Sequence, residues 1–94
     1  MKFLLDLIQI FLRMKLYRLK QALMKILAEL RPDVDFEENK ELVDSGELDS
    51  FDIVSLVGEL CDAYDIEIGA DDIVPENFNS VEAICALITR LQED

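Results

Sequence analysis

The chain contains no histidine and no tryptophan, and it has only two cysteines, two prolines and three glycines in 94 residues. Without histidine it cannot form Ser-His or Cys-His catalytic pairs or a histidine-ligated metal site. Two cysteines are too few for a disulfide scaffold, so the cytoplasm is the expected location. Basic residues are also scarce: 9 stand against 21 acidic ones, and the resulting charge of −12 argues against nucleic acid as a partner.

Apolar residues make up 51% of the chain, which excludes a disordered acidic tail and indicates one folded domain. A domain of this size buries only about 60–70% of the surface that its unfolded chain exposes. That is enough for a small helical core, whereas a large substrate cavity with its own catalytic machinery is not expected. We therefore expect a protein that is not itself an enzyme.

Charge is divided unevenly along the sequence. Residues 1–31 contain seven basic and two acidic side chains, a formal charge of +5, and residues 32–94 contain two basic and 19 acidic ones, a charge of −17. Opposite charges favour contacts between the two parts. The negative net charge favours solubility of the domain. A surface of one sign also steers oppositely charged partners, so the acidic part is a candidate docking surface for basic proteins.

The first third of the chain is predicted to be helical. Apolar residues in 14–30 recur at intervals of three and four, with lysine and arginine between them. Leu5, Ile8 and Leu12 continue this apolar stripe toward the N-terminus, so one helix can run from near the N-terminus to residue 30. Residues 1–13 are thus a helical N-terminal extension, and residues 14–94 are the expected domain.

The role of the extension 1–13 is open at the level of sequence. Asp6 and Gln9 interrupt its apolar run, which argues against a secretory signal, and the run is shorter than the ~20 residues of a membrane span. Basic residues near both ends suit a helix at a membrane surface, but the polar face is thin. The sequence therefore favours two alternatives over membrane binding. The extension packs on the domain or on a second copy, or Met14 begins the cellular protein.

Residues 31–49 are polar and rich in turn-forming residues, which predicts a long, partly ordered loop. Its expected anchors in the core are five apolar residues: Val34, Phe36, Leu42, Val43 and Leu48. Acidic residues from Asp33 onward hint at a calcium loop. However, Glu38 stands where such a loop needs glycine, and Asp44 stands where it needs glutamate. We expect no metal site beyond weak cation binding at the surface.

Two further amphipathic helices are predicted over 50–64 and 80–92, where apolar residues again recur at helical spacing. Each is preceded by residues that favour an N-cap. The candidate caps are Asp49 or Ser50 for the first helix and Asn79 or Ser80 for the second.

The connector 65–79 has room for one short helical turn within 69–74, before Pro75. Cys61 and Cys85 lie on the apolar faces of the two helices beside this connector, so we expect two buried free thiols. Three substantial helices, one short helix and no convincing strand pair predict an all-α fold.

Ser50 is the strongest candidate for a residue that takes part in the protein's chemistry. A glycine-bearing turn at Gly46 leads into the helix that begins at this serine, so its hydroxyl is expected to be exposed. A phosphodiester on that oxygen would lie beside the unpaired N–H groups at the start of the helix. The plain alternative is a serine that only caps the helix. It is a poor candidate for a hydrolase nucleophile, because the chain has no histidine and no G-x-S-x-G motif.

From about residue 15 to residue 92 the sequence resembles an acyl carrier protein of the phosphopantetheine-binding family. The matching pieces are the motif Leu48-Asp49-Ser50, the apolar positions Phe51, Val54, Leu56, Val57 and Leu60, and the segments 64–68, 70–73 and 79–81. Their order and spacing, in an acidic chain of this length, carry the resemblance.

This resemblance implies a four-helix bundle, with three long helices and one short one, that carries 4′-phosphopantetheine covalently on Ser50. A phosphopantetheinyl transferase would attach the group from coenzyme A, and loading and transfer enzymes with basic docking surfaces would exchange acyl thioesters, as in fatty acid biosynthesis. The helix that begins at the modified serine would be the main docking surface. Its implied docking positions are Asp49, Phe51, Asp52, Ser55, Gly58, Glu59 and Asp62.

The sequence departs from fatty-acid carriers at three of these positions. Phe51 stands where leucine is usual, and in this respect the motif is more similar to D-alanyl carrier proteins. Ser55 and Gly58 stand where many fatty-acid carriers present an acid and a methionine. An aminoacyl carrier, of the D-alanyl or peptide-synthetase type, is therefore the main alternative, and an unmodified helical adaptor is the other.

Overall fold

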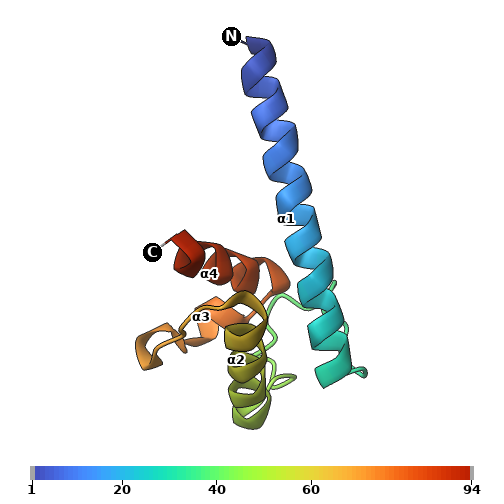
Figure 1. Ribbon diagram of the computed structural model, residues 1–94. Helices are drawn as coiled ribbons and strands as arrows, with labels where there is room; N and C mark the ends of the chain where they lie inside the picture. Colours follow the sequence, from blue (N-terminus) through green and yellow to red (C-terminus); the bar gives the residue numbers. More distant parts are fainter. Residues whose placement is uncertain (1, 94) are drawn as a thin grey trace.

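A computed structural model describes residues 2–93, so Met1 and Asp94, at the ends of the predicted extension and domain, lie outside the described residues. Four α-helices follow one another along the chain, with one short 3-10 helix between the second and the third (Figure 1). The elements are α1 (Lys2–Leu30), α2 (Ser50–Tyr64), η1 (Ala70–Asp72), α3 (Pro75–Phe78) and α4 (Val81–Glu93). No strand occurs among residues 2–93, and the predicted all-α fold is confirmed.

The core lies where the C-terminal half of α1 packs against α2 and α4. Every helix contributes side chains that are almost fully buried. The core residues at 0% exposure are Leu23 and Leu27 of α1, Leu42 of the loop, Leu56 and Leu60 of α2, and Val81, Ile84 and Ile88 of α4. Their burial follows the periodicity of three and four in the sequence, because these intervals place apolar side chains on one side of each helix.

The long loop 31–49 is held by apolar anchors and by one asparagine. Phe36, Leu42 and Leu48 are buried, as predicted. Asn79 Oδ1 accepts hydrogen bonds from the backbone N–H groups of residues 43 and 44, at 3.0 and 3.1 Å, and its backbone carbonyl accepts one from residue 42 at 2.8 Å. Asn79 therefore ties the loop to the start of α4, and Ser80 is the residue that caps this helix, with its Oγ 3.0 Å from Ala83 N.

The connector between α2 and α4 differs from the prediction. The expected turn before Pro75 is present as η1, but a second short helix, α3, which was not predicted, begins at Pro75. Proline is favoured at the first helical position, because its φ suits a helix and its missing N–H would have no partner there. Four residues are too few to show helical periodicity, so only this proline could have signalled α3.

The N-terminal half of α1 extends beyond the bundle (Figure 1). Between residues 2 and 17 every side chain is exposed. One alternative from the sequence, that the extension packs on its own domain, is therefore wrong for the described residues. Within residues 2–93 no helix combines the length and apolarity needed to span a bilayer.

Both cysteines are free thiols, as expected. Cys85 is buried as predicted, whereas Cys61, which was also expected to be buried, is half-buried. Burial raises the pKa of the Cys85 thiol, which makes it a poor nucleophile at neutral pH. The Cys85 thiol is therefore not a candidate for the chemistry of the protein.

Tyr64 at the end of α2 has a buried hydroxyl that finds no hydrogen-bond partner among residues 2–93. Burial also raises the pKa of this phenol. A buried polar group without a partner costs about 1–3 kcal/mol, so Tyr64→Phe is expected to raise the free energy of unfolding by about 1 kcal/mol. Urea unfolding of both chains measures the difference. A clear loss of stability in Tyr64→Phe would show that the hydroxyl is satisfied.

Candidate functional site

Ser50 is the first residue of α2, and its side chain is exposed. The preceding residues fix its place. Leu48 is only 2% exposed, and its backbone N–H donates to Leu42 O at 2.9 Å. Gly46 adopts a φ of 84°, a left-handed conformation that glycine accepts without strain and that turns the loop toward the helix. The buried leucine and the glycine turn together present the Ser50 hydroxyl at the surface.

A capping box closes the start of α2. Asp49 is the N-cap, and its Oδ1 accepts the N–H of Asp52 at 2.9 Å. Asp52 Oδ2 in turn accepts the N–H of Asp49 at 3.2 Å. The two carboxylates satisfy N–H groups that the helix leaves without partners. Of the two predicted caps, Asp49 fills the role, which leaves the Ser50 hydroxyl free for other chemistry.

Arg31, directly after α1, links this capping box to the rest of the domain. Its Nη1 donates to Asp52 Oδ2 at 2.6 Å and to the carbonyl of Glu47 at 2.9 Å. Its other nitrogens donate to both carboxylate oxygens of Asp33, each at 3.0 Å. The hydrogen bonds with Asp33 and Asp52 raise the pKa of the guanidinium, and Arg31 lowers the pKa of Asp33. One arginine therefore joins the end of α1, the loop and the start of α2.

Asp52→Ala is expected to lower the free energy of unfolding by about 1.5–3 kcal/mol, because it removes hydrogen bonds from a charged partner and from the helix start. The matched control is Asp62→Ala, which removes an exposed acid from the same helix and is expected to change stability by less than about 0.5 kcal/mol. Thermal unfolding of both variants and of the parent chain measures these changes in stability. Equal effects of the two variants on stability would mean that the hydrogen bonds of Asp52, including those to Arg31, contribute nothing to the free energy of unfolding.

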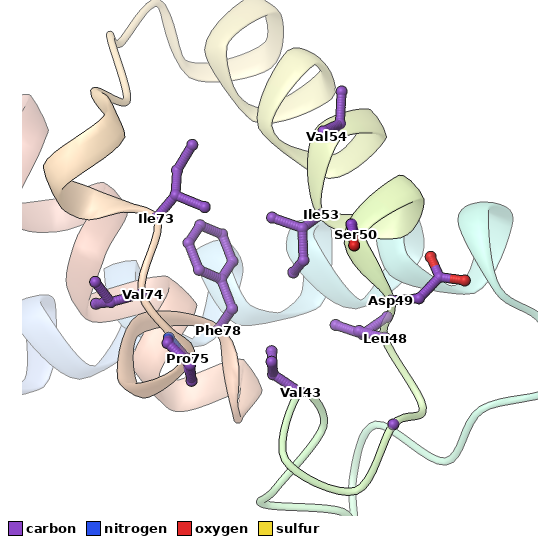
Figure 2. Close-up of a pocket in the computed structure, with 11 residues that line it drawn as sticks. Val43, Leu48, Asp49, Ser50, Ile53, Val54, Ile73, Val74, Pro75 and Phe78 are labelled. Carbon is purple, nitrogen blue, oxygen red and sulfur yellow. The ribbon is translucent and has the colours of Figure 1, made fainter.

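An apolar groove opens beside Ser50, between α2 and the segment from η1 to α3 (Figure 2). Its volume is about 500 Å³. Ile53 and Phe78 face each other across it, Ile73 and Val74 form the far wall, and Ser50 stands at the near rim. The remaining lining residues are Val43, Gly46, Leu48, Asp49, Val54 and Pro75. The groove is large and apolar enough to receive a small hydrophobic ligand.

Two apolar residues of α2 lie outside the core, contrary to the periodicity in the sequence. Phe51 is 84% exposed and Val54 is 71% exposed. They lie on the solvent side of α2, and Val54 also lines the groove. Helical spacing places these residues on the helix but does not show which face the other helices cover.

Most of the predicted docking positions are exposed on α2. These are Phe51, Ser55, Gly58, Glu59 and Asp62, with Asp49 just before the helix. Asp52 differs, because its side chain is only 13% exposed and its carboxylate is held by Arg31 and the cap. At Gly58 a Cβ would meet nothing within 4 Å, so no neighbouring group of the described chain requires a glycine there.

The groove and the role of Arg31 are not predicted by the sequence. Both depend on contacts between segments far apart in the chain. The only local signal for Arg31 is a basic residue directly after a helix, which many helices have. No cluster of three or more metal-ligating residues occurs between residues 2 and 93.

A family model described as the phosphopantetheine attachment site matches residues 18–88. The match covers most of the chain, so the chain belongs to this family of phosphopantetheine-binding carrier domains. The family carries covalently attached 4′-phosphopantetheine, and its members interact with phosphopantetheinyl transferases and partner enzymes. Carrier domains of this kind are generally not catalytic. A comparison with curated protein sequences gave no match.

The residues around Ser50 fit this group. The hydroxyl is exposed, and the N–H groups of Ser50 and Phe51 donate to no acceptor among residues 2–93. These N–H groups lie at the positive end of α2, which favours a phosphate nearby. When bound, phosphopantetheine supplies a flexible arm that ends in a thiol.

Proposed function

We propose that this protein is an acyl carrier whose Ser50 bears phosphopantetheine and whose groove beside α2 receives the acyl chain. The observation that supports it most is the position of an exposed serine at the rim of an apolar groove. The expected reaction at Ser50 joins its Oγ to the phosphate of the phosphopantetheine portion of coenzyme A. The bond from that phosphate to the adenosine bisphosphate breaks, and a base of the transferase takes the hydroxyl proton.

The apolar lining favours an acyl over an aminoacyl cargo. The groove walls that face Ser50 are formed by Ile53, Ile73 and Phe78, and burial of an ammonium group among them would be costly without a partner. An alkyl chain gains about 0.8 kcal/mol for each methylene that it buries. The similarity of Asp49-Ser50-Phe51 to D-alanyl carriers supports the alternative, so the cargo needs a direct test.

The partners we propose are enzymes with basic docking surfaces. Residues 32–94 carry a charge of −17, and Glu59 and Asp62 are exposed on α2. Such a surface increases association rates with basic proteins and makes them sensitive to salt. A role in fatty acid metabolism and the cytoplasmic location stay predictions from the sequence.

Loading of the modified chain with an octanoyl group is expected to raise its Tm by about 4–8 °C relative to the unloaded chain, which corresponds to about 1 kcal/mol. Loading with an alanyl group should leave Tm unchanged. The rise should be smaller in Ile73→Asp, which makes the exposed groove wall polar, and retained in Ile73→Leu. Octanoyl and alanyl groups with equal effects on Tm would contradict an acyl-binding groove.

A further inference from the structure

The N-terminal half of α1 exposes an unusual amount of apolar surface. Ten large hydrophobic side chains between residues 3 and 16 are exposed by 47–75%. The segment lies away from the bundle (Figure 1), and the buried α1 residues are Leu23 and Leu27, farther along the helix. Apolar patches of this extent on a soluble protein mark an interaction site.

This surface has two apolar sides and one narrow polar line. Leu5, Ile8 and Leu12 continue the face that packs into the core farther along α1, whereas Phe3, Leu7 and Phe11 lie on another side. Four polar residues follow one line at intervals of three and four: Lys2, Asp6, Gln9 and Arg13. At 3.6 residues per turn these four span only about 60° of the helix circumference. Lys15 lies on the opposite side, near the end of the segment, where its long side chain can extend toward water.

A second copy of the chain would cover only one of these apolar sides. If a partner helix packed along Leu5, Ile8 and Leu12, then Phe3 and Phe11 would stay in water at 75% and 67% exposure. A two-helix contact of about 16 residues is also short for an independent interface. The thin polar face argued against a membrane helix in the sequence, but the structure leaves both apolar sides exposed. A lipid bilayer covers both apolar sides at once and leaves the polar line in water.

The charge of the segment suits an anionic membrane surface. Residues 2–17 contain three basic side chains and one acidic one, a formal charge of +2, and Arg18 follows directly. Between residues 2 and 28 Asp6 is the one acidic residue, and the 16 helical residues 2–17 extend about 24 Å. Glu82 and Glu93 of α4 line a hollow together with Leu16, at the end of the segment. The part of α1 nearest the N-terminus lies farther from these acids than the screening length of about 8–10 Å.

We propose that residues 2–17 of α1 bind to the surface of a bilayer that contains anionic lipids, with both apolar sides in the lipid and the polar line toward water. The carrier bundle would then be held beside the membrane with Ser50 on its exposed surface. This interaction does not depend on modification of Ser50.

Flotation of the unmodified full chain with vesicles of phosphatidylcholine and phosphatidylglycerol tests this interaction. The chain should float with these vesicles, and less with phosphatidylcholine alone. Phe11→Glu is expected to weaken binding about tenfold or more, because it places a charge in the lipid. Gln9→Glu makes the same change in charge on the polar line, and its effect should be much smaller. Both positions are exposed, so neither variant disturbs the core.

Three results would overturn the proposal. The chain could remain unbound to either kind of vesicle. The two variants could lose binding equally, which would show electrostatic attraction without insertion of the apolar sides. The chain could ignore vesicles and form an oligomer that Phe11→Glu dissociates, which would make a second copy the partner of this helix.

Discussion

Replacement of Ser50 with alanine is expected to abolish transfer of phosphopantetheine to the chain, whereas replacement of Ser55 with alanine should leave transfer intact. Both serines are exposed on α2. Only Ser50 lies within the capping box, directly after the N-cap Asp49, and at the rim of the groove. The alanine variant should still fold, because Asp49 rather than Ser50 caps the helix.

The measurement is incorporation of a fluorescent pantetheine from labelled coenzyme A by a broad-specificity transferase, followed on a gel. Circular dichroism and thermal unfolding confirm that both variants are folded. Labelling of Ser50→Ala at the level of the parent chain would place the attachment site elsewhere. Loss of labelling in Ser55→Ala alone would have the same consequence.

Phe78→Ala is expected to lower the free energy of unfolding by about 3–5 kcal/mol, the usual cost of truncating a buried phenylalanine. Phe78 is 1% exposed and is the buried residue of the four-residue helix α3, so it anchors this helix in the core. The loss is a large part of the 5–15 kcal/mol that stabilises a typical small domain, so Tm should fall by more than about 12 °C.

Phe51→Ala is the matched control for this prediction. It makes the same change at a side chain that is 84% exposed, so stability should change by less than about 0.5 kcal/mol. Urea unfolding of both variants gives the comparison. A small effect of Phe78→Ala would show that Phe78 does not anchor α3 in the core. It would also weaken the case that the groove is already formed before a ligand binds.

Two helices could be predicted well from the sequence, because each has apolar residues at helical spacing and capping residues at its start. The predicted range 50–64 is the observed α2, and the predicted 80–92 differs from α4 by one residue at each end. Capping residues and apolar spacing act locally, so they can be read without knowledge of the fold. The same holds for the core anchors Leu42 and Leu48, which are isolated apolar residues in a polar loop.

The arrangement of the site could not be predicted in the same way. The groove needs the loop at Val43 to meet Val74 and Phe78, more than 30 residues away. The ion pair between Arg31 and Asp52 joins residues 21 apart. Local patterns carry no information on such contacts, because they arise only when the helices pack. Ser50 could be predicted as the candidate attachment residue because the motif around it is contiguous in the chain.

The central claim is most directly tested by the intact mass of the chain before and after incubation with a phosphopantetheinyl transferase and coenzyme A, with fragmentation to locate any added group. We predict a gain of one phosphopantetheine on Ser50. An unchanged mass, in a folded sample shown to be unmodified at the start, would contradict the account. It would indicate a helical adaptor that keeps the carrier fold without its chemistry.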